Sequence, residues 1–274
     1  MNKIGVMINF KATTDARAEM KKIREIGCEC CQISVWNTAL YTDANAAAIK
    51  EAAEEYGIEI STLWAGWSGP CEWNFTAGPM TLGIVPEAYR MKRIEEIVMG
   101  ADFAVKIGAP RVATHVGFLP ESIGDAQYYP VLAALKHIVR ECEKRGVTFL
   151  FETGQETPVT LLRFIEAIAS PNVGINMDTA NLILYGKANS ADAISVFGKY
   201  VRDTHIKDGF YPTDGFKLGR EVKVGEGMAD LPEVIRRLRT VNYEGNYVIE
   251  REISGDQQTK DIIDTVKLLR DILG

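Results

Sequence analysis

Apolar segments alternate with amphipathic segments along the whole chain. Three apolar runs lie near the start, "KIGVMIN", "CCQISVW" and "IEISTLWA", and the segments between them, "DARAEMKKIREIG" and "DANAAAIKEAAEEYG", have the apolar spacing of helices. Each of these helical segments ends in a glycine, which is typical of helix C-termini. The same unit of strand and helix recurs to the end of the sequence, which predicts eight strand and helix pairs.

The predicted strands are apolar over nearly their whole length, as in "VTFLFETG" and "NVGINMD". Such strands are typical of a parallel sheet covered by helices, because neither face then meets water. Eight units in 274 residues favour a closed (β/α)8 barrel, an α/β fold, over an open sheet. Because no linker rich in serine or proline divides the chain, we expect a single TIM-barrel domain over residues 1–274.

The charge of the chain favours a small-molecule ligand. The formal net charge is −6 and charges of both signs are mixed along the sequence, which disfavours nucleic acid or an anionic membrane as a partner. The N-terminal "KIGVMINF" is not a basic and apolar leader, and no apolar run approaches the roughly 18 residues of a membrane span. We therefore expect a soluble, cytoplasmic protein.

The five cysteines show no CxxC spacing, although three of them lie together in "CECC". An odd number without that spacing indicates neither a disulfide framework nor a zinc knuckle. We expect most of these cysteines to be reduced residues of the core.

Each of the last four predicted strands ends in a side chain that can bind a metal ion. "FLFETG" carries Glu152, "GINMDTAN" carries Asp178, "RDTHIKDG" carries His205 and "YVIERE" carries Glu250. The C-terminal ends of barrel strands face one mouth, and neighbouring strands lie only about 4.8 Å apart. Three carboxylates and an imidazole gathered there would be costly without a cation. The pattern predicts one divalent ion, with Mn²⁺ as first candidate and Mg²⁺, Co²⁺ or Zn²⁺ as others.

The plainer interpretation is that these acids are solvated, or that they pair with Lys207 and Arg251. A single acid at one strand end would favour that interpretation. Four such residues in consecutive units favour the metal site instead.

The sequence resembles the xylose isomerase-like barrels over nearly its whole length. The similarity is most specific at "ETG", "MDTAN", "THIKDG", "VGEGMADLPEVIRRL" and "YVIERE". This family includes sugar phosphate isomerases and epimerases, the D-tagatose 3-epimerase group and the apurinic-site endonucleases. The resemblance implies that Glu152, Asp178, His205 and Glu250 hold one divalent ion.

The resemblance also implies a proton-transfer mechanism that the chemistry supports. Metal coordination of a ketose carbonyl and its neighbouring hydroxyl stabilises the enediolate that forms when the adjacent proton leaves. We expect Glu152 and Glu250 to remove and return that proton. Whether the product is an epimer or an aldose stays open, as does the identity of the sugar or sugar phosphate.

Four further residues are candidates for substrate binding. His115 closes the fourth predicted strand, where a buried structural histidine is the alternative. Lys207 follows His205 by two residues and would point the same way on a continuing strand. For Glu156 an acid in the first turn of a helix is an equally good account. Asn181 stands where many relatives have a histidine, which argues against a multinuclear zinc centre.

A long connection, "GWSGPCEWNFTAGPMTLG", follows the third predicted strand. Its rings at Trp67, Trp73 and Phe75 can stack on a sugar and exclude water, so we expect a wall or lid that includes Trp67 as a substrate contact. The same rings also suit a contact in a homo-oligomer. The isolated "GEG" is too weak a pattern to predict a phosphate loop.

Other functions remain open at this level. A lyase such as an inosose dehydratase also begins by removing an α-proton, and product mass distinguishes it from an isomerase. An apurinic-site endonuclease would need a basic groove and more than the three histidines present. A sugar-binding barrel without catalysis is disfavoured by the intact ligand set. Lys217, Arg220 and Arg251 can serve a phosphate or remain solvated charges.

Overall fold

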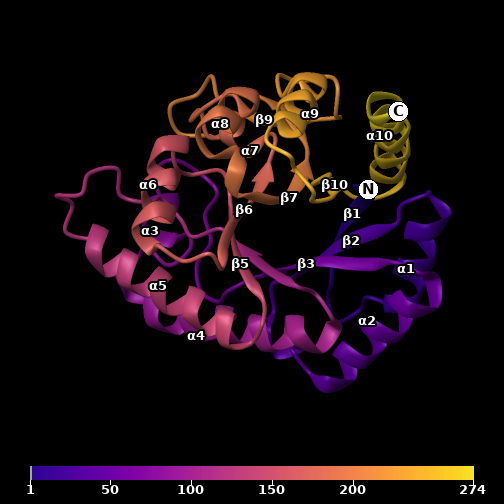
Figure 1. Cartoon of the computed structure of the whole chain (residues 1–274), viewed down its shortest axis with the longest axis horizontal. Helices are drawn as coiled ribbons and strands as arrows, with labels where there is room; N and C mark the ends of the chain where they lie inside the picture. Colours follow the sequence, from indigo (N-terminus) through magenta and orange to yellow (C-terminus); the bar gives the residue numbers. More distant parts are fainter. Residues whose placement is uncertain (1) are drawn as a thin grey trace.

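A closed barrel of eight parallel strands forms the centre of the protein (Figure 1). The computed structural model describes residues 2–274. The barrel strands are β1 (Ile4–Asn9), β2 (Cys30–Val35), β3 (Glu59–Ala65), β4 (Arg111–Thr114), β5 (Thr148–Glu152), β6 (Val173–Asp178), β7 (Val201–Ile206) and β10 (Tyr247–Ile249). Their order around the barrel is β1-β10-β7-β6-β5-β4-β3-β2, which confirms the predicted TIM-barrel fold.

Helices surround the barrel in chain order (Figure 1). The longer ones are α1 (Ala16–Glu25), α2 (Asp43–Tyr56), α4 (Glu87–Ile107), α5 (Tyr128–Lys144), α6 (Pro158–Ile168), α8 (Ser190–Phe197), α9 (Leu231–Thr240) and α10 (Asp256–Leu273). Short helical segments are α3 (Gly78–Thr81), α7 (Asn181–Leu184) and two 3₁₀ turns, η1 (Thr38–Leu40) and η2 (Gly198–Tyr200). The C-terminal helix α10 lies beside β1, near the N-terminus (Figure 1).

Most of the barrel strands are largely apolar because both of their faces are covered. Every residue of β2 and of β6 is buried. Outward-facing side chains of the strands pack against the helices in one large core cluster. A smaller cluster of Trp64, Ala113 and Leu150 fills part of the barrel interior. Continuous apolar runs are therefore the expected sequence of these strands.

The register of the last strands brings their polar ends together. Glu152 of β5 pairs with Asn176 of β6, and Asp178, two residues further along β6, pairs with His205 of β7. His205 in turn pairs with Val248 of β10, and Glu250 lies two residues after Val248. The backbone N–H of Glu250 donates to the carbonyl of Ile206. Because side chains two residues apart share a face, the four predicted ligands point into the same mouth.

The long segment after β7 contains a hairpin that the sequence pattern did not predict. Strands β8 (Asp208–Phe210) and β9 (Arg220–Val222) form an antiparallel pair outside the barrel. The following "GEG" turn wraps around Asp208, whose carboxylate accepts hydrogen bonds from the backbone N–H groups of Gly225, Gly227 and Ala229 at 2.9 Å. Those amides are therefore occupied by a side chain of the protein itself.

The cysteines and the helices bear on two further expectations. All five cysteines are free, and four of them are buried, as predicted for reduced core residues. Within residues 2–274, no helix combines the length and the apolar character that a membrane span requires.

Candidate metal centre

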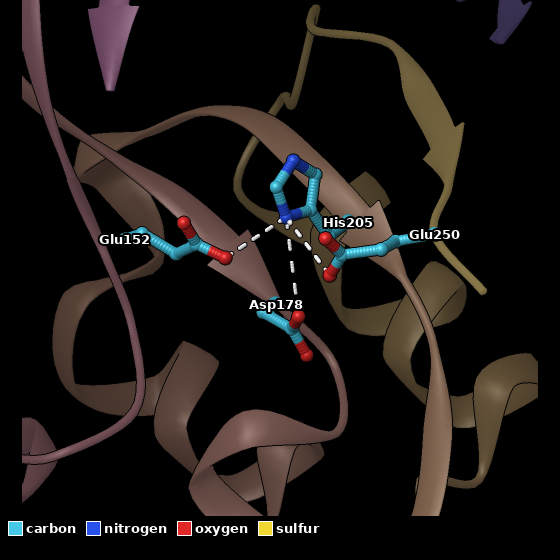
Figure 2. Close-up of side chains that lie close together, drawn as sticks. All are labelled: Glu152, Asp178, His205 and Glu250. Carbon is cyan, nitrogen blue, oxygen red and sulfur yellow. Dashed lines mark hydrogen bonds and ion pairs between the residues drawn. The ribbon is translucent and has the colours of Figure 1, made fainter. Parts of the chain in front are cut away.

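Glu152, Asp178, His205 and Glu250 converge at the mouth of the barrel (Figure 2). One ligand atom from each lies within 4.8 Å of the others. His205 Nδ1 is the common point, at 3.0 Å from Glu152 Oε1, 3.5 Å from Glu250 Oε2 and 3.9 Å from Asp178 Oδ2. The predicted convergence of four strand ends is therefore present in the fold.

These side chains are buried rather than solvated. The exposed fractions of the Asp178 and His205 side chains are both 0%, those of Glu152 and Glu250 3% and 16%. Asp178 Oδ2 finds no hydrogen-bond partner among the residues that the structure describes. A buried carboxylate oxygen without a donor is destabilising unless a cation or a proton compensates its charge.

The donor set fits a divalent ion. Ligand atoms held at about 2.1 Å from one ion lie at most about 4.2 Å apart, so only a small contraction of the observed cluster is needed. Three carboxylates and one imidazole are ligands that Mn²⁺, Mg²⁺, Co²⁺ and Zn²⁺ all accept. The orphaned oxygen of Asp178 supplies a free ligand atom.

Without an ion, His205 is the internal counter-charge of the cluster. Burial lowers the pKa of His205, but Glu250 and Glu152 outweigh this effect and raise the pKa to about 10. Burial likewise raises the pKa of Asp178 well above its ordinary value, against the influence of Lys207. Protonation of each of the four groups therefore depends on the others, and binding of a divalent ion would release the protons held by Asp178 and His205.

Glu152 remains a carboxylate in this environment. Burial raises its pKa, but the imidazoles of His115 and His205 and the indole of Trp64 lower it to about 2. Burial lowers the pKa of His115 itself, whose ring borders Glu152. Trp64 donates its indole N–H to Glu152 Oε2. His115 Nε2 lies 3.6 Å from the other oxygen, so this ring borders the cluster.

Lys207 is buried beside the acids and pairs with three of them. Its Nζ lies 2.8 Å from Glu252, 3.2 Å from Glu250 and 3.7 Å from Asp178, and 3.3 Å from Asn181 Oδ1. Ion pairing of the acids with Lys207 is therefore present for Glu250 and Asp178. Lys207 lies beside the four predicted ligands and not between them.

Arg251 is directed elsewhere, although its neighbour Glu250 belongs to the cluster. It forms 2.9 Å pairs with Glu221 and Asp261. Its charge is therefore compensated by two carboxylates outside the cluster.

Glu156 is buried and lies outside regular structure. Both of its carboxylate oxygens have no hydrogen-bond partner within residues 2–274. The helix that follows starts at Pro158 and is capped by Thr157, so the interpretation of Glu156 as a first-turn acid is wrong. Burial raises the pKa of Glu156 to about 8, because its environment disfavours the charged form.

A cavity of about 630 Å³ opens above the cluster. Its lining contains polar side chains and aromatic rings. The polar ones include Glu152, Glu250, His115 and Asn181, and the rings are those of Trp36, Trp64, Trp73 and Tyr185. Trp73 comes from the β3–α4 connection, as predicted for a wall over the mouth.

The placement of Trp67 differs from the predicted one. This ring is buried behind the cavity wall, where it packs edge-on against Trp36, and the guanidinium of Arg93 lies 4.1 Å from its centroid. Trp36 and Trp64 occupy the wall in its place. Both were missed from the sequence, although Trp36 directly follows β2 and so carries the same strand-end signal as the metal ligands.

Comparison with known proteins agrees with this architecture. Residues 20–272 match the family model described as a xylose isomerase-like TIM barrel, and the chain belongs to this family. The crystal structure of a xylose isomerase domain protein from Planctomyces limnophilus has a TM-score of 0.91 at 30% sequence identity, covering 98% of this chain and 96% of that one.

More distant relatives share the fold. An uncharacterized protein from Methanocaldococcus jannaschii is 23% identical over 288 residues, which covers 99% of this chain and 89% of that protein. The 3-keto-D-glucoside 4-epimerase of E. coli has a TM-score of 0.75 at 18% identity, covering 99% of this chain and 100% of that one.

Proposed function

We propose that the protein is a divalent-metal-dependent isomerase or epimerase that moves a proton next to the carbonyl of a sugar or sugar phosphate. The observation that supports this most is the buried cluster of Glu152, Asp178, His205 and Glu250 beneath an open cavity. A bound ion, Mn²⁺ in our proposal, would polarise the substrate carbonyl and stabilise the negative charge that develops as the adjacent proton leaves.

Glu152 and Glu250 are the proposed proton carriers. Burial raises the pKa of each, but neighbouring positive charges outweigh it and lower both below the ordinary value, so both are carboxylates at neutral pH. They come from β5 and from the end of β10 and lie on either side of His205 (Figure 2). A substrate held between them offers one face to each, so one can accept a proton and the other can return one.

Other residues would bind and shield the sugar. His115 and Asn181 line the cavity and can bind hydroxyl groups. Lys207 is buried against Asn181 and Glu250, two residues of that lining, whereas Glu156 is buried outside it. The rings of Trp36, Trp64 and Trp73 can cover the C–H faces of a sugar. Exclusion of water there would protect the charged intermediate state from quenching.

Several structures with this fold are named as epimerases of sugars or of a keto-glucoside. Besides the 3-keto-D-glucoside 4-epimerase, they include a D-psicose 3-epimerase with 15% identity and an L-ribulose 3-epimerase with 17% identity. A xylose isomerase-like barrel from Mycobacterium smegmatis, 16% identical, was solved in complex with magnesium. These names support a keto sugar as the substrate class and a divalent ion as the cofactor.

The test is a substrate screen in deuterium oxide. The protein is incubated with Mn²⁺ and a panel of ketoses, keto-glycosides and their phosphates, and the products are followed by NMR and mass spectrometry. We expect solvent deuterium to enter at the carbon next to the carbonyl of at least one compound, without loss of water.

Three results would contradict the proposal. Loss of water from the product indicates a lyase. Undiminished turnover after removal of metal by EDTA excludes the metal-dependent mechanism. Absence of exchange for every compound, in a protein that binds Mn²⁺, favours a binding protein without catalysis.

A further inference from the structure

A chain of buried amides reaches the metal centre from the opposite wall of the barrel. Gln32 of β2 and Asn176 of β6 are both fully buried. Gln32 Oε1 lies 2.9 Å from His205 Nε2, and Gln32 Nε2 donates to Asn176 Oδ1 at 2.9 Å. In the order of strands, β2 and β6 stand four places apart in a barrel of eight, so these contacts cross the interior.

Packing alone does not account for a carboxamide at this position. The barrel interior combines apolar side chains such as Trp64, Ala113 and Leu150 with buried polar groups that hydrogen-bond to one another, such as Asp203, which accepts from Ser61 and Thr62. Burial of an amide is costly unless its hydrogen bonds are made, and a leucine would fill similar space without that cost. The polar side chain of Gln32 therefore points to a role that depends on its hydrogen bonds.

The direction of the hydrogen bonds follows from the atoms. Asn176 Oδ1 can only accept, so it holds the NH₂ group of Gln32 toward itself and turns Gln32 Oε1 toward His205. Because Gln32 Oε1 also can only accept, His205 must carry a hydrogen on Nε2. A neutral imidazole with hydrogen on Nε2 has its lone pair on Nδ1, which is the atom that faces the three carboxylates (Figure 2).

We propose that Gln32 is a positioning residue for the metal centre, which fixes the tautomer and the ring orientation of His205 so that Nδ1 is presented to a divalent ion. Asn176 orients Gln32 in turn. This inference rests on the proposed metal-dependent function. It assigns to β2, which supplies none of the four predicted ligands, a direct part in metal binding.

The test compares Mn²⁺ binding by isothermal titration calorimetry in the wild type and three variants. Gln32→Leu removes the acceptor, and we expect the Kd for Mn²⁺ to rise about 10- to 100-fold, as is usual for loss of a partner of a metal-binding histidine. Gln32→Glu keeps an acceptor oxygen and should recover most of the lost affinity. Ser61→Ala removes a buried hydrogen bond to Asp203 in the same barrel and should leave the affinity unchanged.

A second measurement needs no substitution. The chain has only three histidines, so ¹⁵N-labelled imidazole signals of the Mg²⁺-loaded wild type are resolvable. We expect the hydrogen of His205 on Nε2 and a metal-shifted Nδ1. The Co²⁺ absorption spectrum of Gln32→Leu should also differ from that of the wild type and of Ser61→Ala, because a misoriented ring changes the ligand geometry.

The outcomes separate this inference from the function on which it rests. Tight Mn²⁺ binding by a folded Gln32→Leu protein, or a hydrogen on Nδ1 in the Mg²⁺-loaded wild type, would overturn the role of Gln32 alone. A wild type that binds neither Mn²⁺ nor Mg²⁺ would overturn both proposals. If Gln32→Leu does not fold, the imidazole spectrum of the wild type decides.

Discussion

At the scale of single residues, four carboxylic acids near the mouth have different protonation behaviour because their neighbours differ. Burial raises the pKa of Glu156 and of Asp178, and at Asp178 it outweighs the opposing influence of Lys207. Glu152 and Glu250 are also buried, but His115 and His205 lower the pKa of Glu152, and Lys207 and His205 lower that of Glu250. Residue type alone therefore does not determine which acid is charged at neutral pH.

Replacement of Glu250 by glutamine should abolish most of the turnover. Glu250→Gln keeps the size of the side chain but removes a proton acceptor and weakens a metal ligand, and we expect kcat to fall about 10²- to 10⁴-fold. The measurement is the rate of deuterium exchange into the substrate. Glu143→Gln is the control, since this exposed glutamate of α5 lies outside both the ligand cluster and the lining of the cavity. Equal losses in both variants would contradict the role of Glu250.

Replacement of Glu156 by glutamine should stabilise the metal-free protein at neutral and alkaline pH. Because the pKa of Glu156 rises from 4.5 in the unfolded chain to about 8 in the fold, the folded state holds the proton more tightly. The contribution of Glu156 to stability is thus most favourable below about pH 4.5 and declines as the pH rises toward 8. We expect Glu156→Gln to remove this decline, with a gain on the order of 4 kcal/mol at pH 8.

The measurement is the thermal unfolding midpoint of Glu156→Gln and wild type in EDTA between pH 5 and pH 8.5. The difference between the two proteins should widen with pH. Glu244→Gln, at an exposed position, should show no such trend. A constant difference across this range would argue against a protonated Glu156 in the fold.

At the scale of elements, a buried arginine of α4 makes four hydrogen bonds to the connection between β3 and α4. Arg93 of α4 donates to the backbone carbonyls of Ser68, Pro70, Thr81 and Gly83 at 2.6 to 3.0 Å. Its guanidinium also lies over the ring of Trp67. A segment without long strands or helices is therefore ordered by side-chain hydrogen bonds, which keeps Trp73 at the cavity wall.

Arg93→Met should loosen this connection. Loss of the guanidinium leaves several carbonyl groups without a donor, at about 1–3 kcal/mol each when buried, so we expect a destabilisation of about 3 kcal/mol or more. Hydrogen exchange should accelerate in residues 66–83 more than in α2. The control is Arg145→Met, which removes a surface guanidinium paired with Asp102 and Glu141. Unchanged exchange in residues 66–83 would show that the connection is ordered by other contacts.

At the scale of the whole molecule, four strands must close around one point for the site to exist. The acids of the cluster repel one another in the metal-free fold, and the orphaned oxygen of Asp178 adds to the cost. A cation bound at this point joins β5, β6, β7 and the end of β10. Metal binding should therefore stabilise the entire barrel.

Addition of Mn²⁺ at about 100 times its Kd should raise the unfolding free energy by about 2.7 kcal/mol, which corresponds to roughly 5 °C or more in Tm. The measurement is differential scanning calorimetry with Mn²⁺ and with EDTA. Asp178→Asn should show a much smaller shift, and its metal-free form should be more stable than the metal-free wild type at neutral pH, because burial raises the pKa of Asp178 and an amide removes the free-energy cost of protonating this carboxylate on folding. The same Tm in Mn²⁺ and in EDTA would contradict a metal site.

Much of the architecture was predictable from local pattern. The eight strand and helix units and the strand-end positions of Glu152, Asp178, His205 and Glu250 follow from apolar runs and their polar ends. The hairpin β8–β9 was not predictable from the sequence, because its strands have three residues each and lie in a segment rich in turn-forming residues. Short strands leave too little periodicity to detect.

The cavity wall was only partly predictable for a different reason. Trp67 and Trp73 lie in the same segment, yet one is buried against Arg93 and the other lines the cavity. Trp64 belongs to β3 and Trp36 directly follows β2, and both segments have the pattern of buried apolar strands. Which ring lines the cavity depends on the path of the backbone in this connection, and that path cannot be derived from the spacing of residues in the sequence.

The sequence by itself determined the barrel and the identity of the four side chains at its mouth, because apolar periodicity and strand ends are local properties of the chain. Tertiary structure alone decided that Lys207 contacts Asp178, Glu250 and Glu252 together, that Glu156 is buried without a hydrogen-bond partner among residues 2–274, and that Gln32 reaches His205 across the interior. These contacts join residues far apart in the chain, at distances set by barrel closure and strand stagger.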